Sequence, residues 1–118
     1  MIELLGLRTV IYPTTDLAAS TAWWTEVLGF GPYFEEPYYV GFDVAGYELG
    51  LLPDANPADG AHVYWRVEDV AAAVGDSIGR GATLHTAAQD VGGGIITASV
   101  VAPDGSIVGF ISAPAAGG

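Results

Sequence analysis

Two stretches of the chain carry apolar residues at the spacing of a helix. The first covers residues 16–28, and its spacing of three and four residues predicts one buried face. That face consists of Leu17, Thr21, Trp24 and Leu28. A second helix is predicted over residues 69–80. Asp16 and Asp69 stand at the N-cap positions, and a glycine follows each helix as its terminator.

Apolar and polar residues alternate with a period of two before and after each helix, which predicts short β-strands. One such stretch begins at Thr9 and another at His62, upstream of the two helices. Further strands are expected at 33–36, 38–44, 47–52, 83–86, 95–101 and 106–111. Tight turns at Ala45-Gly46 and Pro103-Asp104-Gly105 separate the last two strands of each half.

The two halves of the chain repeat each other at a constant offset of 53 residues, from 9 to 62 and from 16 to 69. A repeat of this kind indicates a duplicated βαβββ unit. The length fits one domain. We therefore expect a single α+β domain over residues 1–118, made of a module at 7–52, a linker at 53–60 and a module at 61–112.

The composition narrows the class of partner. The 118 residues include 14 acidic side chains against three arginines and no lysine, which gives a formal net charge of −11. Nucleic acids and anionic membranes are excluded as partners, because both need clustered basic side chains. The lack of cysteine excludes disulfides and thiolate metal sites. With no signal peptide or membrane span in the sequence, we expect a cytoplasmic protein.

Three segments give the chain a family resemblance. They are Thr-Asp-Leu-Ala-Ala-Ser-Thr-Ala-Trp-Trp-Thr-Glu-Val-Leu-Gly-Phe at 15–30, His-Val-Tyr-Trp-Arg-Val-Glu-Asp-Val at 62–70 and Ala-Pro-Asp-Gly-Ser at 102–106. Within a doubled βαβββ unit, they resemble the vicinal oxygen chelate superfamily, which has the glyoxalase, bleomycin-resistance and dioxygenase fold. The resemblance implies a cup-shaped mixed sheet in each module, helices packed on the outside and a ligand cavity in the concave face.

The resemblance also implies where a metal would bind. Enzymes of the family hold a divalent metal through four strand positions, usually His or Gln, Glu, His and Glu. Carried onto this chain, these positions fall on Thr9, Glu48, His62 and Gly109. Threonine is a poor ligand and glycine has no side chain, whereas a catalytic metal needs about three protein ligands. We therefore expect no metal or other cofactor; the alternative is a divalent metal on His62 and Glu48. His85 is predicted in another strand and is not expected to substitute.

Side-chain alternation indicates which residues of the second module face the cavity. A period of two places His62, Tyr64 and Arg66 on one face of a strand and apolar residues on the other. The polar face is expected to line the cavity. Arg66 fits an ion pair with one of the many carboxylates equally well.

The first module has a dense run of aromatic residues. Tyr33, Tyr38 and Phe42 lie close to Glu35 and Glu36 in the sequence. Aromatic rings stack on flat ligands, and carboxylates attract positive ones. The same run also fits a dimer interface.

These features predict a homodimer that binds a small molecule, similar to the bleomycin-resistance branch, and sequesters an aromatic or cationic natural product without converting it. The expected ligand contacts are Thr9, Tyr33, Tyr38, Phe42, Glu48, His62, Tyr64, Arg66 and Gly109. One alternative is an enzyme of the same superfamily, either a metal-dependent lyase, isomerase or dioxygenase, or a metal-free enzyme with His62 as base. Another is a structural or regulatory dimer module whose cavity is filled by its own side chains.

Overall fold

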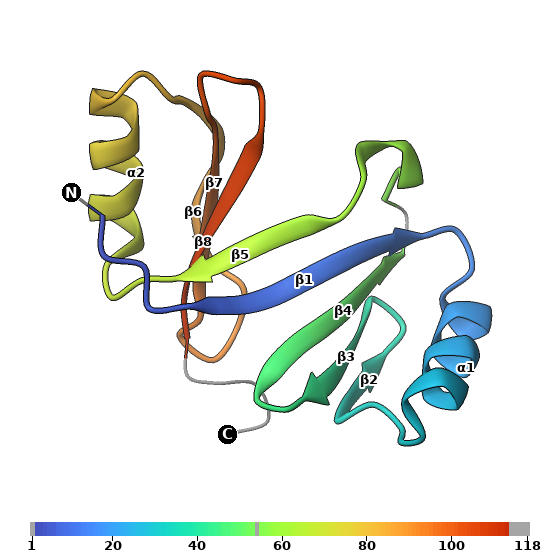
Figure 1. Ribbon diagram of the computed structural model, residues 1–118. Helices are drawn as coiled ribbons and strands as arrows, with labels where there is room; N and C mark the ends of the chain where they lie inside the picture. Colours follow the sequence, from blue (N-terminus) through green and yellow to red (C-terminus); the bar gives the residue numbers. More distant parts are fainter. Residues whose placement is uncertain (1, 54, 114–118) are drawn as a thin grey trace. The chain divides into compact units, whose positions relative to one another are not determined.

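The computed structural model describes residues 2–53 and 55–113. They divide into two compact units, which we call the N-terminal unit (residues 9–53 and 55–61) and the C-terminal unit (residues 2–8 and 62–113). Both follow the element order β-α-β-β-β (Figure 1). The α+β class and the doubled architecture predicted from the repeat are confirmed.

The N-terminal unit has a half-sheet in the order β2-β3-β4-β1. Its elements are β1 (Leu7–Thr14), α1 (Leu17–Leu28), β2 (Phe34–Glu36), β3 (Tyr39–Val44), β4 (Tyr47–Pro53) and the short 3₁₀ helix η1 (Pro57–Asp59). Strand β1 runs parallel to β4, whereas β2, β3 and β4 pair antiparallel. Ala45 and Gly46 both have positive φ, so the predicted tight turn between β3 and β4 is present. Part of the predicted linker forms η1.

The C-terminal unit has the corresponding order β5-β8-β7-β6. Its elements are β5 (His62–Arg66), α2 (Val70–Gly79), β6 (Thr83–Asp90), β7 (Ile96–Val101) and β8 (Ile107–Ser112). Strand β5 runs parallel to β8, and the other pairs are antiparallel. Strand β6 extends to Asp90, four residues beyond the predicted end, because two register shifts against β7 let pairing continue through residues without clear alternation.

Both helices begin and end as the sequence predicts. The Asp16 carboxylate accepts a hydrogen bond from the backbone N–H of Ala19 at 3.0 Å, and Asp69 accepts one from Ala72 at 3.0 Å. Gly29 adopts the left-handed conformation after α1, with φ of 81°. Neither helix of the described residues is long and apolar enough to cross a membrane.

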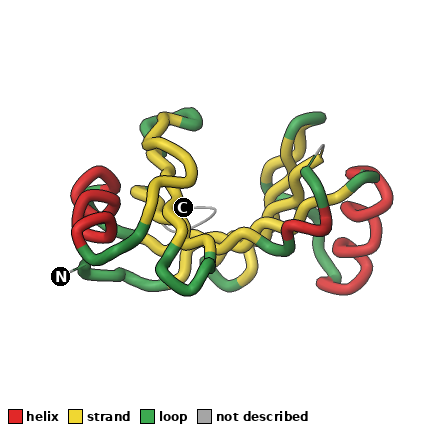
Figure 2. The backbone as a smooth tube through the Cα atoms, turned by 90° about the horizontal axis from the view of Figure 1, so that it is seen from above, coloured by secondary structure: helices red, strands yellow, loops and turns green. Residues whose placement is uncertain are grey.

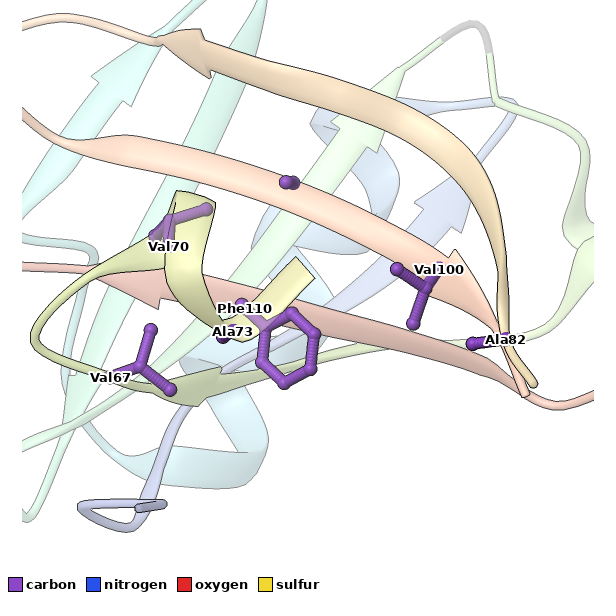
Figure 3. Packing of buried hydrophobic residues seen from close by; sticks show 7 residues of the cluster. Val67, Val70, Ala73, Ala82, Val100 and Phe110 are labelled. Atoms are coloured by element: carbon purple, nitrogen blue, oxygen red, sulfur yellow. The ribbon is translucent and has the colours of Figure 1, made fainter. Parts of the chain in front are cut away.

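Each helix packs against the core of its own unit. Figures 1 and 2 both show each helix beside the strands of its unit. The N-terminal core contains Val40, Phe42, Leu49 and Leu51, with Leu17, Trp24 and Leu28 of α1 packed against it. The C-terminal core contains Val67, Val70, Ala73, Ala82, Ala98, Val100 and Phe110 (Figure 3). In both sheets the core residues alternate with residues on the other face, which we call the open face of each unit.

One residue expected in the ligand site belongs to a core instead. Phe42 is 0% exposed and packs among the residues under α1. Phe42 directly follows Gly41, which lies on the open face. Because successive side chains of a strand point to opposite faces, Phe42 points towards the helix. The expectation that Phe42 contacts a ligand is therefore corrected, and we leave Phe42 out of the candidate site.

Candidate functional site

The open face of the N-terminal unit is built around two paired glycines. Gly41 of β3 lies opposite Gly50 of β4 and, on its other side, opposite Phe34 of β2. On the parallel side of the sheet, Thr9 of β1 lies opposite Glu48 of β4. Directly opposed residues share a face, so these side chains surround a floor of bare backbone.

A hydrogen-bond network fixes the Glu48 carboxylate over this floor. The Thr9 hydroxyl donates to Glu48 Oε1 at 3.1 Å, and the Tyr33 hydroxyl donates to Glu48 Oε2. A Cβ built on Gly41 would lie 2.8 Å from Glu48 Oε2, closer than real contacts allow. Three of the predicted site residues, Thr9, Tyr33 and Glu48, are thus brought together, and glycine at position 41 leaves room for the carboxylate.

Tyrosine and phenylalanine rings continue the open face beyond Glu48. The Tyr39 ring lies across Gly50, where any Cβ would collide with its hydroxyl. The Phe34 ring centre is 6.2 Å from that of Tyr38 and 6.3 Å from that of Tyr39. Neither Phe34 nor Tyr39 is among the predicted site residues. The signal for Tyr39 in the sequence is its two-residue spacing from Gly41, which places both on one face of the strand.

The open face of the C-terminal unit holds a small hollow of about 60 Å³. The residues that line it are His62, Val63, Tyr64, His85, Thr86, Ser99, Ile107 and Gly109. The predicted residues His62, Tyr64 and Gly109 therefore come together. Arg66 lies on the same strand but is not among the lining residues; its backbone pairs with Ile111 of β8.

His85 is a further residue of the candidate site that the sequence did not predict. His85 lies in a different strand from His62, yet both histidines of the chain line one hollow. His85 Nδ1 shares hydrogen bonds with Ser99 Oγ at 2.8 Å and Thr86 Oγ1 at 3.1 Å. The register shift in β6 near residue 86 is the local feature that places these groups together.

Tyr64 closes the hollow on one side. Its ring lies against Gly109, where an added Cβ would come within 2.6 Å of Tyr64 Cδ1 and of the Val63 carbonyl oxygen. Burial raises the pKa of the Tyr64 hydroxyl above its ordinary value of 10.0, because the phenolate would lose solvation there. Tyr64 is therefore a neutral hydroxyl at neutral pH.

The register also corrects one of the four metal positions. Ile11 pairs with Gly50, and Tyr64, 53 residues after Ile11, pairs with Gly109. Glu48 precedes Gly50 by two residues, so its counterpart is Ile107 rather than Gly109. The correction replaces one residue unable to bind a metal with another.

These residues do not fit the metal site that the fold family implies. Thr9 and Ile107 occupy two of its four positions, and the Glu48 carboxylate is held by Thr9 and Tyr33. Among the described residues, no group of three or more His, Cys, Asp or Glu side chains lies close enough together to hold a metal ion. We therefore derive no chemistry through a metal.

Comparison with known proteins agrees with the fold. The family model described as Glyoxalase/Bleomycin resistance protein/Dioxygenase superfamily matches residues 6–110. The chain therefore belongs to this superfamily. No curated protein matches the sequence significantly.

Solved structures similar to this chain share its fold at low sequence identity. Methylmalonyl-CoA epimerase from Mycobacterium tuberculosis is 18% identical, with a TM-score of 0.74 over 94% of this chain and 90% of that one. A superfamily member from Vibrio splendidus is 22% identical, with a TM-score of 0.66 over 91% and 99%. A hypothetical protein from Bacillus halodurans is 12% identical, with a TM-score of 0.75 over 91% and 93%. At these identities the similarity concerns the fold alone, so the activity has to be argued from the site.

Proposed function

We propose that this superfamily member is a cytoplasmic, homodimeric protein that binds a flat aromatic small molecule, favours cationic compounds and holds them without a metal and without converting them. Such a protein protects by sequestration, because bound compound is removed from the free pool by mass action. The observation that carries the proposal is the group of aromatic side chains on the N-terminal unit. These are Tyr33, Phe34, Tyr38 and Tyr39.

The aromatic group is more exposed than packing alone requires. Tyr38 is 65% exposed at the turn between β2 and β3, and Phe34 is exposed beside it. Rings at such separations adopt edge-to-face arrangements, which leave ring faces to stack on a further flat molecule. A ligand covering them would remove apolar surface from water, at about 25 cal/mol per Å².

The charge of the same segment supports a preference for cations. Glu35 and Glu36 of β2 are exposed and follow Phe34 directly in the sequence. The chain has a formal net charge of −11. An excess of carboxylates raises the local concentration of a positive ligand, and ring faces attract cations directly.

Isothermal titration after dialysis against a chelator tests the proposal. A panel of aromatic cytotoxic natural products should include at least one compound bound with micromolar affinity or better. Phe34→Ala and Tyr38→Ala should each weaken that binding at least about tenfold, as for aromatic anchors of other interfaces. Tyr47→Ala is the matched control, because Tyr47 is 54% exposed in the same unit but alternates onto the face opposite Glu48. Uniformly millimolar binding, or equal loss in the control, would contradict the proposal.

A second candidate function is a metal-free enzyme with His62 as general base. It is favoured by the place of His62 in the hollow beside Tyr64, where no hydrogen bond to the imidazole is formed within the described residues. This function predicts that His62→Gln abolishes product formation from a bound compound while binding persists. A bound compound recovered unchanged from the wild-type protein would favour sequestration.

A further inference from the structure

We propose that the C-terminal unit contains a second binding site, a hollow that receives an oxyanion group of a small molecule, such as a carboxylate or a phosphate. The site lies entirely within the half-sheet β5-β8-β7-β6 (Figure 1). The proposal goes beyond the aromatic ligand of the N-terminal unit and does not depend on it.

The residues around the hollow differ in charge from the rest of the chain. The chain has 14 acidic side chains and two histidines, yet the hollow is lined by both histidines and by no aspartate or glutamate of the described residues. Its other polar lining residues are Tyr64, Thr86 and Ser99, each of which carries a hydroxyl group. Imidazole and hydroxyl groups can all donate hydrogen bonds to an oxygen.

Several of these side chains have donor groups that are not used within the protein. His85 uses Nδ1 for Ser99 and Thr86, which leaves Nε2 as the ring nitrogen for a ligand. Within the described residues, neither the His62 ring nor the Tyr64 hydroxyl forms a hydrogen bond. A tyrosine hydroxyl can donate a hydrogen bond, so this group is available to an oxygen atom.

The charges around the hollow favour an anionic group over a cationic one. A cationic group in the hollow would meet no carboxylate among the lining residues. The net charge of −11 repels anions at long range. At physiological ionic strength this repulsion is screened over about 8 Å, so the donors inside the hollow decide the preference.

The size of the hollow sets which part of a molecule can enter. A volume of about 60 Å³ is well below the roughly 300–1,000 Å³ of a typical site for a drug-sized ligand. It suits one small polar group, and the rest of the ligand would remain outside. An oxyanion attached to a larger body fits this limit.

The two histidines make the proposal testable by NMR on the full chain. Because the chain contains only His62 and His85, a two-bond ¹H–¹⁵N correlation spectrum shows two imidazole systems, which single variants assign. We would titrate benzoate, phenyl phosphate and phenyltrimethylammonium in the presence of EDTA, each up to about 10 mM, ten times the concentration that half-fills a millimolar site. Benzoate or phenyl phosphate should shift both imidazoles, and the stronger of the two identifies the class of oxyanion.

Two conservative variants locate the binding energy. Tyr64→Phe keeps the ring on Gly109 and removes only the hydroxyl, and it should weaken oxyanion binding about five- to tenfold. His62→Gln should weaken it about tenfold or more. Tyr47→Phe, which removes an exposed hydroxyl in the other unit, is the matched control and should bind as wild type.

Three results would overturn the proposal. In one, neither oxyanion shifts a histidine signal over the titration. In another, phenyltrimethylammonium shifts both histidines as strongly as benzoate. In the last, Tyr64→Phe and His62→Gln both give folded spectra and bind the oxyanion as tightly as Tyr47→Phe.

Discussion

The two units share a backbone plan but carry opposite chemistry on their open faces. The N-terminal unit presents a carboxylate, Glu48, held by hydroxyls and flanked by aromatic rings. The C-terminal unit presents two histidines and three hydroxyl-bearing residues around a hollow without acidic residues among its lining. At the corresponding positions, Thr9 becomes His62 and Glu48 becomes Ile107. A duplicated scaffold has thus kept its core pattern while its two open faces have diverged.

A glycine beneath a tyrosine recurs in both units, although the tyrosine comes from a different strand. Gly50 lies under Tyr39 of the antiparallel neighbour β3, whereas Gly109 lies under Tyr64 of the parallel neighbour β5. The glycine is needed in both because the ring occupies the space of a Cβ. Because the tyrosine comes from a different strand, its ring covers the glycine from a different side of the strand in each unit.

The largest expected effect concerns Phe42. If it is a core residue, Phe42→Ala should lower the free energy of unfolding by about 3–5 kcal/mol, through lost burial and a residual cavity. Tyr47→Ala, a change to an exposed ring in the adjacent strand, should stay within about 0.5 kcal/mol. Urea denaturation measures both. Similar stabilities for the two variants would return Phe42 to the list of surface residues.

The glycine positions should differ in their tolerance of alanine. Gly109→Ala should cost about 1–3 kcal/mol, because the new methyl group meets the Val63 carbonyl, which is backbone and cannot move away. Gly50→Ala should cost less, since it meets the hydroxyl end of the Tyr39 side chain. Gly75→Ala, in α2 with open space around it, should stabilise by about 0.5–1 kcal/mol. Equal effects at positions 50 and 109 in urea denaturation would contradict this difference.

The helix caps are where the two units should behave alike. Asp16→Ala and Asp69→Ala each remove one carboxylate that accepts a backbone N–H, and each should cost about 1 kcal/mol. The double variant should lose the sum of the two, since the caps lie in separate units. Thermal denaturation would detect a departure from additivity, and Glu26→Ala on the exposed side of α1 provides the control.

The smallest expected effect is a pH dependence from Tyr64. Its folded-state pKa is raised by burial, so its contribution to stability is complete below pH 10.0 and is lost as the pH rises from there through the folded value. Tyr64→Phe has no proton to lose and should therefore lose less stability than wild type between neutral and strongly alkaline pH. Parallel urea titrations across that range test this, and identical pH profiles would show that burial of the hydroxyl is unimportant.

The sequence predicted the fold well because its signals are local and occur twice. Caps at Asp16 and Asp69, helical spacing and strand alternation each constrain a few residues, and the repeat doubles their weight. The candidate site was predicted only in part. The period-two alternation of side chains correctly placed His62 and Tyr64 on one face of their strand. The same alternation, applied to the strand that contains Phe42, places Phe42 on the face that packs against the helix. The meeting of His85 with His62 depends on register shifts and on strands distant in sequence, for which no local pattern gives a signal.

The central claim is that the open faces of the two units select ligands of opposite charge. Backbone amide chemical shifts of the uniformly ¹⁵N-labelled protein, recorded during titrations with benzoate and with phenyltrimethylammonium, test it most directly. We predict that benzoate perturbs residues around Ser99 and Gly109, whereas the ammonium compound perturbs residues around Phe34 and Tyr38. If both compounds perturb the same unit, or if their preferences are exchanged, the account is contradicted.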